Sequence, residues 1–269
     1  MAKVTQEDKQ EYYEKTTVYR ETIDGLLQRE KTVLDQIQQG AEDTAEKRVA
    51  LAEDMLNLVS CYIILNGVSE SMLRVKDEEA LNEGRKALYR CVCYLEEIVG
   101  TAVDAAFEEY EDRLKALHFL DPIQRYRLAR KIGFTIQLLE NAFGQNTKWR
   151  WSFVDLEGRY AAAAKNIFDL KSAVENRDPR SPWYEPTVYH LRLIIKLFKT
   201  AAQRYQEKFA LSSKSADDIR MGINFLSGLK RIHFLIGERN QAEALKKPLE
   251  VWQNLFESAR KQQSKTAQG

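Results

Sequence analysis

Apolar residues recur three or four positions apart along almost the whole chain, which is the spacing of one face of an α-helix. In the first forty residues this stripe includes Tyr12, Tyr19, Ile23, Leu26 and Val33. Segments that alternate apolar and polar residues, as half-buried strands do, are nearly absent. The pattern therefore predicts an all-α protein.

Capping residues, glycines and prolines divide this pattern into about seven or eight helices, most of them long. The expected helices cover residues 5–39, 42–65, 69–117 with a break near Lys76-Asp77, 121–144, 148–176, 187–211, 215–237 and a last segment from about residue 240. No period of about 34 residues repeats, so we favour an irregular antiparallel bundle over a regular solenoid.

Some helix boundaries depend on single residues. Asn66-Gly67 is expected to form a turn. Asp121 is suited to the N-cap and Pro122 to the first helical position, where no N–H is needed. Pro248 lies inside the last expected helix and should kink it.

Residues 177–186 interrupt the helical pattern between two long helices. The segment 176–190 holds three of the five prolines, Pro179, Pro182 and Pro186. Each proline disfavours the α conformation in the residue before it, so Asp178, Ser181 and Glu185 should be extended. Trp183 and Tyr184 would then be presented on a stiff segment. Two interpretations stay open: a strap whose aromatic side chains fill a gap between helices or between two sub-bundles, and an exposed contact surface.

Charge is distributed unevenly along the chain, although the net charge is only +1. Residues 1–120 hold 15 Lys and Arg against 25 Asp and Glu, a net charge of −10. Residues 121–269 hold 26 basic and 15 acidic residues, a net charge of +11. We expect an acidic helical half, 1–120, and a basic helical half, 121–269, either as two parts or as one continuous domain.

Cysteine content and hydropathy favour a cytoplasmic protein. Three cysteines give no disulfide framework, and the first fifteen residues contain no apolar segment of the kind found in a signal peptide. The most apolar run, 56–65, is much shorter than the roughly 20 residues that span a bilayer. No membrane span is expected.

Motifs for catalysis, cofactors and metals are absent from the sequence. There is no G-x-x-x-x-G-K-[ST] or G-x-G-x-x-G motif for phosphate groups. Di-metal bundles use Glu-x-x-His pairs, but none of the three histidines has an acidic residue three positions earlier. Cys91 and Cys93 lie about 200° apart on a helix, so their thiols cannot share a metal there. We assign no catalytic, cofactor-binding or metal-ligating residue and expect no enzyme activity.

Basic residues near aromatic ones are the remaining candidates for binding. They form short rows on three expected helices, opposite or beside the apolar stripe, and include two tryptophans. These candidates are Arg127, Arg130, Lys131, Lys148, Trp149, Arg150, Trp151, Arg192, Lys196 and Lys199. Rows of cations beside stackable rings are what a protein needs to bind a phosphate backbone. A solvated helix face with tryptophans anchored in the core would show the same pattern, so both interpretations stay open.

The sequence therefore favours a non-catalytic interaction, adaptor or assembly subunit. Oppositely charged halves can dock within one molecule, between copies, or on a charged protein partner. The alternative is a nucleic-acid-backbone-binding subunit of a ribonucleoprotein complex that uses the basic half. An enzyme with an unrecognised helical site is the third hypothesis, and a polar cleft near His190 or His233 would favour it.

Overall fold

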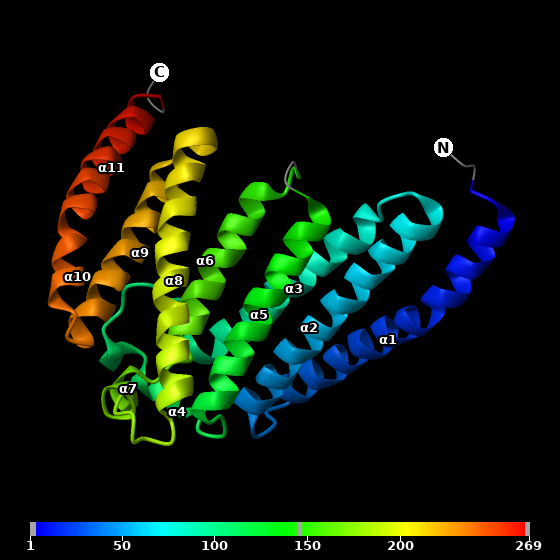
Figure 1. The fold of residues 1–269 in the computed structure, drawn as a ribbon, viewed down its shortest axis with the longest axis horizontal. Coiled ribbons are helices and arrows are strands. Elements are labelled where there is room, and N and C mark those ends of the chain that lie inside the picture. The colour runs from blue at the N-terminus through cyan, green and yellow to red at the C-terminus, as the bar shows by residue number, and fades with distance from the viewer. Residues whose placement is uncertain (1–3, 145–146, 267–269) are drawn as a thin grey trace. The chain divides into compact units, whose positions relative to one another are not determined.

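The computed structural model describes residues 4–144 and 147–266 of the chain (Figure 1). All regular secondary structure in these residues is helical, and they contain no strand. The prediction of an all-α protein is confirmed.

The chain forms two compact units that do not coincide with its acidic and basic halves. The first unit contains residues 1–98 and 127–150, and the second contains 99–126 and 151–269. The first holds 18 basic and 21 acidic residues, and the second 23 and 19. Their net charges are therefore −3 and +4, so the strong charge difference along the sequence almost disappears within the folded units.

In the first unit, long helices pack through an apolar core and a few ion pairs that include a buried carboxylate. Its elements are α1 (Gln6–Gln38), α2 (Thr44–Val68), the π-helical turn η1 (Ser69–Leu73), α3 (Glu78–Val99) up to residue 98, and α5 (Pro122–Phe143) from residue 127. Helix α2 returns along α1 (Figure 1). The buried Glu30 of α1 accepts hydrogen bonds from Arg90 Nε at 2.9 Å and Tyr94 Oη at 2.5 Å on α3.

Helix α2 and η1 together, Thr44–Leu73, are long and apolar enough to cross a membrane by length and composition. This corrects the sequence estimate, which considered only the run 56–65. The structure buries 61% of the most apolar window of this segment. Core helices pass the same test, and Leu51, Met55 and Leu58 are fully buried here.

The expected turn at Asn66-Gly67 is wrong, because α2 continues through both residues to Val68. The buried Asn66 side chain instead accepts a hydrogen bond from the Asp77 N–H at 2.9 Å, which holds the following loop against α2. The break near Asp77 is confirmed: its Oδ1 accepts the Ala80 N–H at 2.9 Å at the start of α3.

The second unit contains the start of α5 and all the later helices. Its other elements are η2 (Phe107–Glu109), α4 (Glu111–Lys115), α6 (Arg150–Asn166) from residue 151, α7 (Leu170–Asn176), α8 (Tyr184–Lys208), η3 (Phe209–Ser213), α9 (Ala216–Leu235), α10 (Arg239–Ala244) and α11 (Lys246–Thr266). Helix α8 packs along α9, which also contacts α10 and α11 (Figure 1). The rings of Phe198 and Phe225 pack edge to face in the core of the second unit.

Three expected helices are divided in the structure. Residues 69–117 break after Val99, where Gly100 has a φ of +79° and its missing Cβ leaves room for Arg113. Residues 148–176 break at Asp169, which caps α7 by accepting the N–H groups of Lys171 and Ser172. The last segment forms α10 and α11, so Pro248 lies in the first turn of a new helix instead of at a kink.

The described residues thus contain eleven α-helices, three of them (α4, α7 and α10) shorter than eight residues. The proline-rich loop lies wholly within the second unit and does not join the two units. The loop is also shorter than expected: α8 begins at Tyr184, so Glu185 and Pro186 are helical rather than extended. Pro186 is tolerated because the first turn of a helix needs no intrahelical N–H.

Candidate functional site: a pocket and a basic row on helix α8

A pocket of about 250 Å³ lies in the second unit, beside the first turns of α8. The proline-rich loop, helix α7 and the start of α5 form its other walls. Its lining consists of Leu120, Pro122, Arg125, Phe168, Asp169, Ser172, Ala173, Asn176, Trp183, Pro186, Thr187 and His190. The predicted loop residue Trp183 is therefore a half-buried wall of this pocket, and Tyr184 is the first residue of α8.

His190 is the most buried titratable group of the pocket, with 1% of its surface exposed. Its Nε2 lies 3.0 Å from the Ala164 carbonyl oxygen. Because a carbonyl can only accept, Nε2 carries the proton and Nδ1 is left as an acceptor. Burial lowers the pKa of His190 to about 4, and the nearby positive charge of Arg125 acts in the same direction. The imidazole is therefore neutral at pH 7.

Arg125 connects the start of α5 to two other chain segments. Its guanidinium donates to the Leu117 carbonyl at 2.8 Å, to Leu120 at 3.0 Å and to Ile167 at 3.3 Å. Burial lowers the pKa of Arg125, and the carboxylate of Asp169 opposes that change. The group stays charged, since an arginine pKa begins far above neutrality. These bonds hold one wall of the pocket in place.

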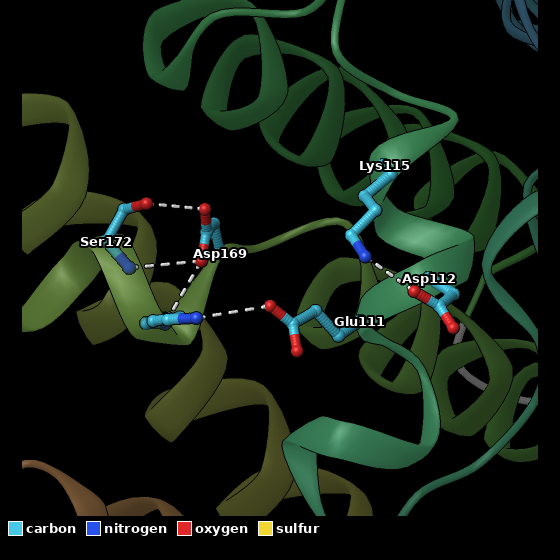
Figure 2. Close-up of polar contacts among 6 residues, drawn as sticks. Glu111, Asp112, Lys115, Asp169 and Ser172 are labelled. Atoms are coloured by element: carbon cyan, nitrogen blue, oxygen red, sulfur yellow. Dashed lines mark hydrogen bonds and ion pairs between the residues drawn. The ribbon is translucent and has the colours of Figure 1, made fainter.

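Asp169 fixes the first turn of α7 on the opposite wall. Its Oδ1 accepts the N–H groups of Lys171 at 3.0 Å and Ser172 at 3.1 Å, and its Oδ2 accepts the Ser172 hydroxyl at 2.5 Å. Figure 2 shows Glu111 directed from α4 toward this turn, where it pairs with Lys171 at 3.4 Å. Asp112 and Lys115 form a separate pair along α4 at 2.6 Å.

The Ser172 hydroxyl of the pocket has a different partner from that of a catalytic serine. The Ser172 hydroxyl donates to Asp169, so it is not paired with His190 as a nucleophile would be with its base. In the part of the chain that the structure describes, no group of three or more His, Cys, Asp and Glu side chains could hold a metal ion.

The predicted basic and aromatic candidates are divided between the two units. Arg127, Arg130, Lys131, Lys148, Trp149 and Arg150 belong to the first, and Trp151, Trp183, Tyr184, Arg192, Lys196 and Lys199 belong to the second. Trp151 packs against the core of its unit.

In the first unit, several of these cations already have a partner. Lys131 pairs with Glu53 at 2.7 Å, and Lys148 lies 4.0 Å from Glu78. The Trp149 ring is covered by the Arg85 guanidinium at 3.9 Å from its centroid.

Arg192, Lys196 and Lys199 are exposed on the outer face of α8. Among residues 4–144 and 147–266, none of them makes an ion pair or hydrogen bond. We call these three residues the α8 row. Tyr189, 46% exposed, lies one turn before Arg192 and stacks on Tyr126 at 6.1 Å.

Lys165 is a buried cation that was not predicted from the sequence, and 2% of its surface is exposed. Its ammonium donates to the Val103 carbonyl at 3.2 Å and lies 4.5 Å from the centroid of the Tyr110 ring. Burial lowers its pKa to about 8. The sequence does contain a signal, because Lys165 follows four consecutive alanines that are all buried in α6.

The model of the TP0443 family matches residues 8–260. The chain belongs to the TP0443 family. No curated protein and no solved structure matches it. The name TP0443 states no activity, substrate or partner, so the function of this family member is argued from its own geometry. Both the pocket and the α8 row lie inside the matched segment.

Proposed function

We propose that the protein is a non-catalytic interaction subunit that docks an acidic protein surface on the outer face of α8. The α8 row carries this proposal. Two of the other predicted cations, Lys131 and Lys148, already have a carboxylate of the same unit beside them. Within the described residues, the three cations of the α8 row have no such carboxylate. They can therefore attract an external acidic group without breaking an internal ion pair.

The spacing of the α8 row suits a helical acidic partner. Positions 192, 196 and 199 are four and three residues apart, so they follow one face of α8 over about 10 Å. Carboxylates at i, i+4 and i+7 on another helix have the same spacing. Tyr189 and Arg192 add residue types that are enriched at the centres of protein interfaces.

The role proposed here depends on this local row and not on the charge of whole segments. With net charges of −3 and +4, the two units carry a much smaller charge difference than the sequence halves do. We also propose that the helices form the antiparallel bundle expected from the sequence. The packing of α1 against α2 and of α8 against α9 supports this arrangement.

Binding to a nucleic-acid backbone is the second candidate for the same surface. The exposed ring of Tyr189 favours it, since a base can stack on a tyrosine beside cations. The modest charge of the second unit counts against a free-standing binder, because such proteins are usually basic over the whole domain.

The test measures binding of two labelled probes by fluorescence anisotropy at low and high salt. The probes are an alanine-based helical peptide with glutamates at i, i+4 and i+7, and a single-stranded oligothymidine. We expect the peptide to bind at low salt, and we expect the combined variant R192E, K196E, K199E to bind at least about tenfold more weakly.

A matched variant, R239E, K247E, K261E, makes the same change in net charge at exposed positions of α10 and α11. It should bind the peptide like the unmodified protein. Equal losses in both variants, or no peptide binding at low salt, would contradict docking on α8. Tighter binding of oligothymidine than of the peptide, lost only in the α8 variant, would replace the first candidate with the second.

A further inference from the structure

We propose that the pocket beside α8 binds a small neutral aromatic molecule that carries one hydroxyl or ring N–H group, of the phenol or indole class. This site is separate from the α8 row, which lies on the opposite, solvent-exposed face of the helix. The proposal rests on the size of the pocket, its walls and two almost wholly buried polar residues, Thr187 and His190.

The volume of the pocket limits the ligand to one or two rings. A cavity of about 150 Å³ in another protein holds benzene. The pocket here has about 250 Å³, which leaves room for a substituent or a fused second ring but not for a nucleotide. Phe168, Trp183 and Pro186 supply flat apolar walls.

Thr187 and His190 lie one turn apart on α8, and both line the pocket while being 3% and 1% exposed. In the described part of the chain, Thr187 Oγ1 and His190 Nδ1 make no hydrogen bond. Polar side chains of residues this deeply buried nearly always have a partner. Because Nε2 of His190 is committed to the Ala164 carbonyl, Nδ1 can only accept, so the missing partner must be a donor.

The charges that line the pocket favour a neutral ligand. Arg125 and Asp169 have opposite charges. The guanidinium donates to three backbone carbonyls, and both oxygens of the carboxylate accept bonds from the first turn of α7. Neither group is left without a partner that a charged ligand would have to supply. An aromatic ring with a single O–H or N–H satisfies His190 and fits the apolar walls.

The experiment is a calorimetric titration of the protein with phenol, indole and toluene. Toluene has the shape of phenol but no donor. We expect phenol and indole to bind and toluene to bind more weakly by about fivefold or more, the size of one neutral hydrogen bond. Equal affinity for toluene and phenol, or no binding of any of the three, would overturn the proposal.

Two variants and one measurement on the unmodified protein place the ligand. Thr187→Val keeps the side-chain shape and should weaken phenol binding about twofold to tenfold. Thr200→Val, on the exposed face of α8, should not change it. In the unmodified protein, phenol should move the ¹⁵N resonance of His190 Nδ1 toward its hydrogen-bonded position. An unmoved resonance while phenol binds would overturn this assignment, whether or not Thr187→Val folds.

Discussion

At the scale of single residues, burial determines what His190 can do. From the sequence, this residue enters only through the enzyme hypothesis, which a polar cleft near His190 or His233 would favour. The structure commits Nε2 to a carbonyl, and burial lowers the pKa to about 4, so the ring does not gain a proton near pH 7. Sequence cannot supply this result, because burial depends on helices α6 and α8 meeting at this point.

The lowered pKa of His190 predicts acid sensitivity of the fold. In the unfolded chain the histidine pKa is about 6.5, so between pH 6.5 and 4 the unfolded state binds more protons than the folded state. Stability should therefore fall as pH decreases through this window, with a contribution of about 3 kcal/mol from His190. Urea unfolding at pH 7 and pH 4.5 measures the change, and His190→Gln should reduce it.

The exposed His118 offers a control for this prediction. His118→Gln should retain the pH dependence of the unmodified protein. If His190→Gln retained the full loss of stability in acid, groups other than His190 would be responsible for it.

Among single residues, the periodicity of the sequence could predict positions that face the core. Of the stripe predicted in the first forty residues, Tyr12 and Ile23 are buried, and Tyr19, Leu26 and Val33 are half-buried. The unpartnered Nδ1 of His190 could not be predicted in the same way, because a missing hydrogen bond depends on tertiary geometry.

At the scale of elements, boundaries with a strong local cap were predicted and the others were not. Asp121-Pro122 starts α5 as expected: Asp121 Oδ1 accepts the Gln124 N–H at 2.7 Å. Asn66-Gly67 resembles a turn in sequence, yet tertiary contact of Asn66 with the next loop keeps it helical. The pocket between α7, α8 and α5 required elements whose distance in space sequence alone does not reveal.

The close packing of α8 and α9 makes a prediction at this scale. A Cβ on Gly228 would lie 2.8 Å from Phe198 Cε1 and 3.0 Å from the Val103 carbonyl oxygen. Gly228→Ala should therefore destabilise the protein by about 1–3 kcal/mol, since overpacking exceeds the helical preference for alanine.

Gly25 in α1 has nothing within 4 Å of the position of an added Cβ. Gly25→Ala should therefore stabilise the protein by up to about 1 kcal/mol. Thermal and urea unfolding of both variants provide the measurement. A stabilising Gly228→Ala would show that α8 and α9 lie farther apart than described.

At the scale of the whole molecule, charge along the sequence proved a poor guide to charge in space. The basic residues Arg127, Arg130 and Lys131 belong to the same unit as the acidic helices α1–α3, where Lys131 pairs with Glu53. The net charges of −10 and +11 for the sequence halves thus become −3 and +4 for the compact units. The docking that we propose therefore depends on a local feature, the α8 row.

The measurement that tests the central claim most directly is lysine footprinting of the unmodified protein with and without the acidic helical peptide. A low dose of an amine-acetylating reagent is followed by mass spectrometry of the digested protein. Docking on α8 predicts slower acetylation of Lys196 and Lys199 when the peptide is bound, with unchanged rates at the exposed Lys247 and Lys261. Protection of Lys247 and Lys261 instead, or of no lysine on α8, would contradict it.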